Sequence, residues 1–123
     1  MDNDTNKLIE NLSIIASDPA LKSSSRLLIL IILYINKKMS FTDLLHSTMM
    51  GKGSLSNHID KMKEEGLITT KNVFRLSGPG IMIEITGKGE NIYQNYIDII
   101  NKLSSNGSEK IIKKSDDKSP FKL

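Results

Sequence analysis

Residues 40–86 constrain the fold of this chain most, because two helical patterns, a turn and two β-rich segments follow one another there without interruption. Residues 41–45 predict a short amphipathic helix, and residues 49–53, which include two glycines, break it. Residues 54–65 predict a second helix, and Gly66 ends it in the position of a left-handed cap. The apolar residues of this second helix recur at spacings of four and three, which places them on one face: Leu55, Ile59 and Met62.

The segment after Gly66 predicts a β-hairpin. Residues 67–74 and 81–86 are rich in β-branched side chains, and the sequence Ser-Gly-Pro-Gly at residues 77–80 predicts a turn between them. A hairpin that follows two helices and a turn is the element order of a winged helix-turn-helix. The sequence therefore predicts a mostly α fold with a small β-hairpin, extended by N- and C-terminal helices, and it indicates DNA as the ligand.

Two helices are predicted before this motif. Thr5 is the expected N-cap of the first, which Asp18 and Pro19 end. The second begins within residues 22–25 and continues to about Lys37. It is apolar on nearly all sides, so we expect it to be enclosed by the rest of the domain, by a terminal helix or by a partner chain.

A long helix is predicted after the hairpin, over residues 88–103. It carries two adjacent apolar stripes with spacings of three and four. One stripe can serve its own domain and the other a second copy of the chain; alternatively, both cover the same core. On the first interpretation the dimer interface is formed by Ile92, Tyr93, Tyr96, Ile99, Ile100 and Leu103.

These patterns divide the chain into four parts. Residues 1–20 are an N-terminal helix that supports the core or a dimer, and residues 21–87 are the winged-helix DNA-binding domain. Residues 88–103 are the C-terminal dimerisation helix. Residues 104–123 are polar and slightly basic, and they predict a flexible tail.

Composition excludes several classes of protein. The chain has no cysteine and only two histidines, His46 and His58, so neither a disulfide nor a metal or other cofactor site is expected. The apolar run at residues 27–35 is about half as long as a membrane span requires, and no secretory pattern opens the chain. We therefore expect a cytoplasmic protein that does not contact a membrane.

No catalytic pattern is present either. Residues 46–53 approach the phosphate-binding loop pattern, but the first glycine and the final hydroxyl are missing, and a helix precedes the loop where a strand is required. No serine or histidine has an identifiable base or orienting partner. The chain is not predicted to be an enzyme.

The second helix of the motif presents the candidate DNA contacts. Asn57 is suited to pair with adenine, and Lys52 and Lys61 are suited to neutralise phosphates. His58 flanks the apolar face, which favours a packed histidine bonded to a neighbouring element over a base contact. The alternative is that the exposed residues are solvated surface positions. The full predicted set is Thr42, Lys52, Ser54, Ser56, Asn57, Lys61, Lys71 and Arg75.

Charge supports this assignment weakly. Residues 40–86 contain five basic and five acidic side chains, and the predicted turn of the wing has no basic residue. A DNA-binding surface is normally a basic patch. The neutral motif favours the alternative function, which is a winged-helix module that binds protein and not nucleic acid.

Residues 26–100 resemble the winged-helix transcriptional regulators of the MarR/ArsR-like group, particularly the small archaeal and bacterial type. The resemblance is carried by Arg-Leu-Leu-Ile-Leu at 26–30, Ser-Phe-Thr-Asp-Leu-Leu at 40–45, Gly-Ser-Leu-Ser-Asn-His-Ile at 53–59, Glu-Gly-Leu-Ile at 65–68, and Ile85, Thr86 and Gly89. It implies a homodimer on double-stranded DNA, with the 54–65 helix of each subunit in a major groove, the wing on the backbone or minor groove, and the terminal helices forming the dimer. The group often has arginine at Asn57 and more arginines in the wing. The cysteine and histidine clusters of its metal-sensing branch are absent, and the resemblance specifies neither an effector nor an operator.

Overall fold

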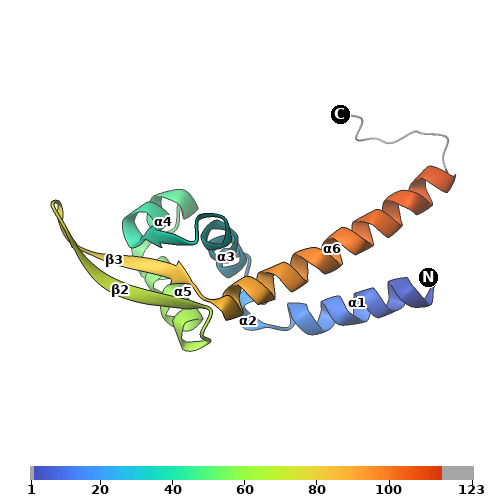
Figure 1. Ribbon diagram of the computed structural model, residues 1–123, viewed down its shortest axis with the longest axis horizontal. Coiled ribbons are helices and arrows are strands. Elements are labelled where there is room, and N and C mark those ends of the chain that lie inside the picture. The colour runs from blue at the N-terminus through green and yellow to red at the C-terminus, as the bar shows by residue number, and fades with distance from the viewer. Residues whose placement is uncertain (1, 115–123) are drawn as a thin grey trace.

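The computed structural model describes residues 2–114, and their side chains to Ser105. A head of helices and strands carries an arm of two long helices that lie side by side (Figure 1). The elements, in chain order, are α1 (Asn3–Ala16), α2 (Pro19–Lys22), α3 (Ser24–Asn36), β1 (Lys38–Ser40), α4 (Phe41–Thr48), α5 (Lys52–Glu64), β2 (Ile68–Arg75), β3 (Gly78–Ile85) and α6 (Gly87–Lys114). This architecture confirms the predicted winged helix-turn-helix with additional terminal helices.

Local capping residues explain where the first helices begin. Asp2 caps α1, because its carboxylate accepts a 2.7 Å hydrogen bond from the amide of Thr5. The assignment of Thr5 as the N-cap was therefore wrong, and Thr5 lies in the first turn, 8% exposed. Asp18 caps the short helix α2, which the sequence did not predict as a separate element. Ser23 caps α3, within the predicted range.

The end of α5 follows the sequence prediction. Gly66 has a φ of 77°, in the left-handed region that glycine adopts without strain. Its amide donates to the carbonyl of Lys63 and the amide of Leu67 donates to that of Met62, both at 3.0 Å. These two bonds form a Schellman motif, which satisfies the last carbonyls of the helix and turns the chain into β2.

The core lies between α3, α4, α5 and the sheet. The three apolar residues predicted to face inward from α5 are at most 5% exposed. Helix α3 is less enclosed than expected: Ile29, Leu30 and Leu33 are fully buried, but Leu28 is 39% and Ile35 is 71% exposed. Further buried side chains come from the remaining elements of the head: Leu44, Leu67, Ile68, Ile83 and Ile85.

The sheet has three antiparallel strands in the order β1-β3-β2, so the predicted hairpin gains a third strand. Strand β1 is only three residues long, and it pairs with β3 with Met39 opposite Ile83. Arg75 pairs with Gly78, which leaves Leu76 and Ser77 as the turn. The turn therefore lies earlier than the predicted 77–80 segment, most of which belongs to β3.

Helix α6 is longer than expected. It continues through residues 104–114, for which the sequence predicted a flexible tail, and residues 115–123 lie outside the described part of the chain. Two glycines near its start, Gly87 and Gly89, belong to the first turn of the helix. The arm is formed by α6 and α1, and it extends away from the sheet (Figure 1).

Candidate nucleic-acid interface

Helix α5 presents an exposed face opposite its buried residues. Ser54, Asn57 and Lys61 are all exposed, as a helical period predicts when Leu55, Ile59 and Met62 are buried. The exposed side also carries Asp60 and Glu64, which lie in the C-terminal half of the helix. The N-terminal half, from Lys52 to Ile59, contains no carboxylate, and a helix N-terminus carries a partial positive charge.

A hollow of about 650 Å³ adjoins the start of this helix. It brings together three of the predicted contact residues, Thr42 from α4 and Lys52 and Ser56 from α5. Phe41 and Leu45 of α4, Gly53 of α5 and residues 79–81 of β3 complete its lining, and no carboxylate is among the lining residues. The hollow therefore joins the half of β3 nearer the wing turn to the N-terminal end of α5 in one surface.

Lys71 and Arg75 lie on the other side of the hairpin. Strand register places Phe74 and Asn72 opposite Pro79 and Ile81, on the sheet face that packs against the helices nearer the core. Lys71 and Arg75 alternate with these residues and so lie on the outer face. An added Cβ on Gly80 would be 2.9 Å from the Arg75 guanidinium, which shows that Arg75 folds back over β3.

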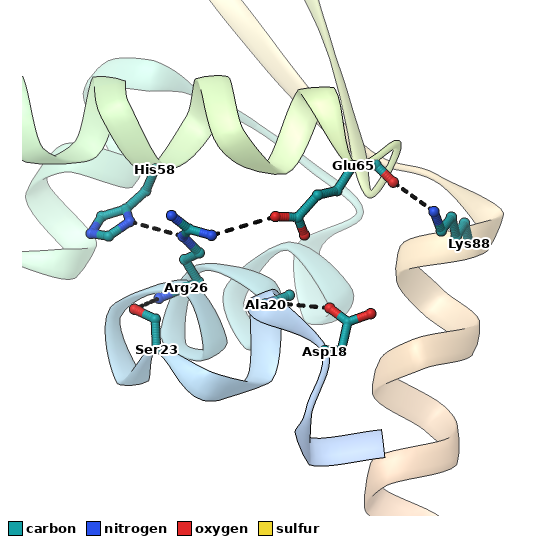
Figure 2. Close-up of polar contacts among 7 residues, drawn as sticks. All are labelled: Asp18, Ala20, Ser23, Arg26, His58, Glu65 and Lys88. Atoms are coloured by element: carbon teal, nitrogen blue, oxygen red, sulfur yellow. Dashed lines mark hydrogen bonds and ion pairs between the residues drawn. The ribbon is translucent and has the colours of Figure 1, made fainter. Parts of the chain in front are cut away.

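Arg26 of α3 bonds to two side chains, one within α5 and one at its C-terminal end (Figure 2). Its Nε–H donates to His58 Nδ1 at 3.2 Å, and its Nη1 forms a 3.4 Å ion pair with Glu65. The prediction of a packed histidine bonded to a neighbouring element is thereby confirmed for His58. The sequence analysis did not assign Arg26 a role. The sequence feature that could have indicated one is the position of a cation at the start of an apolar helix.

The end of α5 is also fixed to the start of α6. Lys88 donates to the carbonyl of Glu65 at 2.7 Å, as Figure 2 shows, and the Thr86 hydroxyl donates to the carbonyl of Gly66 at 2.6 Å. The same hydroxyl accepts from the amide of Gly89 at 3.1 Å. Gly89 is buried so closely that an added Cβ would be 2.4 Å from the carbonyl oxygen of Leu67. We call residues 65–67 together with 86–89 the α5–α6 joint.

The predicted dimer residues divide into two groups. Ile92 and Tyr93 pack against the core of their own chain, where the Tyr93 ring lies 4.6 Å from that of Tyr34, and Ile99 is 9% exposed. Tyr96, Ile100 and Leu103 are half-buried. At least part of the two stripes therefore covers the chain's own core. Elsewhere on the arm, exposed apolar side chains come from α1, where Ile9 is 37% and Ile14 is 65% exposed.

The described residues offer few other sites. Within residues 2–114 there is no cluster of three or more histidines, cysteines or carboxylates that could hold a metal ion. No helix of this part is long and apolar enough to cross a membrane. His46, like Lys52, is exposed.

Comparison with known proteins identifies a family and several proteins that this chain resembles. The family described as winged helix DNA-binding domain matches residues 25–104. An uncharacterized protein of Methanocaldococcus jannaschii is 33% identical over 73 residues, which is 59% of this chain and 70% of that protein. A transcriptional regulator homologue from Pyrococcus horikoshii OT3 has a similar structure, with a TM-score of 0.65 at 22% identity over 81% of this chain and 96% of the other. A protein of Enterococcus faecalis V583 assigned to the MarR family of transcriptional regulators superimposes with a TM-score of 0.62 at 14% identity, over 89% and 93% of the two chains. The resemblance to MarR-like winged-helix proteins is thus confirmed at the level of the fold.

Proposed function

The chain belongs to the winged helix DNA-binding domain family, and we propose that it is a transcriptional regulator that binds double-stranded DNA as a homodimer. Helix α5 of each subunit lies in a major groove, and the wing contacts the backbone or the minor groove. The observation that carries this proposal is the exposed, carboxylate-free N-terminal half of α5, which the core and Arg26 hold in a fixed position.

Each candidate residue then has a distinct role. Asn57 pairs with an adenine edge, while Ser54 lies one turn earlier on the same face. Lys52 and Lys61 neutralise phosphates on either side of the groove. Thr42 and Ser56 bond backbone oxygens from the hollow beside the wing, and Lys71 and Arg75 approach phosphates from the outer face of the hairpin.

The arm supports a dimer. Within residues 2–114 it consists of two helices with no third layer, and Ile9 and Ile14 of α1 are exposed there. A second copy that packs its own arm against this one would cover these residues together with the half-buried Tyr96, Ile100 and Leu103 of α6. Two α5 helices related by a two-fold axis would then meet half-sites about one duplex turn, roughly 34 Å, apart.

The first experiment selects bound duplexes from a random pool and then measures affinity for the selected and a random sequence. Asn57→Ala should reduce the preference for the selected sequence by roughly 1–3 kcal/mol, because a bidentate base contact is lost. Lys61→Ala should weaken both duplexes alike and make the dependence of log K on log salt shallower by about 0.9. Lys22→Ala, at an exposed position of α2 outside both proposed interfaces, is the charge-matched control. If the Asn57 and Lys61 variants behave like this control, α5 does not face the DNA as proposed.

The dimer is tested separately by sedimentation. Ile14→Glu places a charge on the exposed part of the arm and should shift the protein to monomer, whereas Met49→Glu, at a 91% exposed position in the head, should not. Ile99 is a poor choice for this test because it is already buried within its own chain. An oligomeric state that Ile14→Glu leaves unchanged would show that the arm is not the interface.

A second function, a module that binds protein, is favoured by two observations. Residues 40–86 carry no net charge, and the wing ends in exposed apolar side chains, as a protein-binding module would. Such a winged-helix interaction module would show no salt-dependent duplex binding even at low ionic strength, which separates it from the regulator.

A further inference from the structure

The tip of the wing is apolar. Phe74 is 87% exposed and Leu76 is fully exposed, although both are large hydrophobic side chains. The strand register places them at the turn end of the β2–β3 hairpin, and this hairpin protrudes beyond the head (Figure 1). Exposed apolar groups that gather at one protruding point are unusual for a surface with no binding role.

Arg75, the cation nearest to the tip, does not extend beyond it. Arg75 folds back over Gly80, so Leu76 and Ser77 of the turn are the residues that reach farthest from the sheet. No carboxylate occurs between Asn72 and Ile83. The tip therefore presents neither a cation that would attract a polyanion nor a carboxylate that would repel one.

The apolar tip continues into the proposed DNA surface. Phe74 lies opposite Pro79 and on the same sheet face as Ile81, and both Pro79 and Ile81 line the hollow that contains Lys52 and Ser56. When α5 occupies a major groove, this face of the hairpin is turned toward the part of the duplex that α5 contacts. In that arrangement the patch formed by Phe74, Leu76, Pro79 and Ile81 lies beside the minor groove that flanks the α5 half-site.

We propose that Leu76 enters the minor groove as an apolar wedge at a deformable base step, with Phe74 packed against the adjoining sugars; this rests on the proposed function. A minor groove about 6 Å wide admits the two-residue turn but not the whole ribbon. Apolar side chains that part a base step are an established way to grip this groove, and pyrimidine–purine steps unstack most easily. The wing then selects flexible sequence on either side of the bases that α5 reads.

The test compares Leu76→Ser with Arg75→Ala on the duplex selected for the wild-type protein. Leu76→Ser should weaken binding by about 10- to 100-fold, the scale of one buried leucine, without changing the salt dependence. Arg75→Ala should instead make the salt dependence shallower by about 0.9 if it contacts a phosphate. Leu76→Met should retain most of the affinity, and Ile35→Ser, at a 71% exposed position away from the tip, is the matched apolar-to-polar control.

A second readout reports the base step itself. With 2-aminopurine placed at successive positions flanking the α5 half-site, the wild-type protein should raise the fluorescence at one pyrimidine–purine step, and Leu76→Ser should not. If Leu76→Ser matches the wild type in affinity and in fluorescence, the wedge is refuted and the proposed regulator stands. If the wild-type protein shows no salt-dependent duplex binding, both proposals fail and the apolar tip is assigned to a protein partner.

Discussion

Gly89 is the position at which the structure makes its sharpest prediction about stability. It lies in the first turn of α6 and is buried. A Cβ at this position would be 2.4 Å from the carbonyl oxygen of Leu67 and 2.9 Å from Ile85 Cγ1. That carbonyl also accepts a 3.0 Å hydrogen bond from the amide of Thr86, so it cannot move away without loosening the α5–α6 joint.

Two opposing contributions set how much Gly89→Ala changes the free energy of unfolding. Alanine gains about 1 kcal/mol over glycine in a helix. Overpacking costs about 1–3 kcal/mol, and a backbone partner places this position at the upper end or above. We expect a net loss of about 2 kcal/mol or more in the free energy of unfolding, and a Tm lower by at least about 6 °C for a chain of this size.

The assay is urea and thermal unfolding at matched protein concentration, because dimerisation would contribute to the apparent stability. Gly87→Ala is the control on the same turn of α6, since nothing lies within 4 Å of its added Cβ. It should be neutral or stabilising by up to about 1 kcal/mol. A Gly89→Ala protein that melts at or above the Gly87→Ala protein would refute the close approach of α6 to Leu67.

Two further substitutions test the polar contacts of the helices. Thr5→Val should raise the free energy of unfolding by about 1 kcal/mol, because the buried Thr5 hydroxyl has no hydrogen-bond partner in the described part of the chain; a lower urea midpoint would show that it has one. Arg26→Met should lower stability by about 1 kcal/mol, because it removes the donor to His58 and the partly exposed ion pair with Glu65. In a double-mutant cycle with Glu65→Gln, strictly additive losses would show that the ion pair contributes nothing.

The parts of the fold that were predicted correctly are those that local sequence determines. The apolar period of α5 and the glycine that ends it are contained within about one dozen residues. Strand β1 was missed because its three residues carry no pattern of their own. It is a strand only because β3, distant in sequence, lies beside it with Ile83 opposite Met39. The length of α6 was missed because polar composition was interpreted as a tail, although α1 lies beside the helix.

The geometry of the candidate site, like the fold, could be predicted only where local sequence determines it. The exposed face of α5 follows from the helical period alone, so Ser54, Asn57 and Lys61 could be predicted. The pairing of the wing residues across the hairpin could not, because the register of the two strands is set by the turn. Alternation along β2 from the buried Ile68 places Lys71 and Arg75 on the outer face, and the turn at Leu76 and Ser77, not at 77–80, sets Met82 and Gly78 opposite them.

The zero net charge of residues 40–86 does not describe how charge is distributed along α5. The C-terminal end of the helix holds the carboxylates Asp60, Glu64 and Glu65 together with Lys61 and Lys63, and Glu65 is paired with Arg26. The N-terminal half retains Lys52 together with the positive end of the helix dipole, and this half adjoins the hollow and the wing. Bases are commonly read by the N-terminal residues of a recognition helix. The sum over residues 40–86 therefore misstates the field at the proposed interface, and a neutral motif is compatible with a surface that attracts phosphates at the end of α5 where contact is expected.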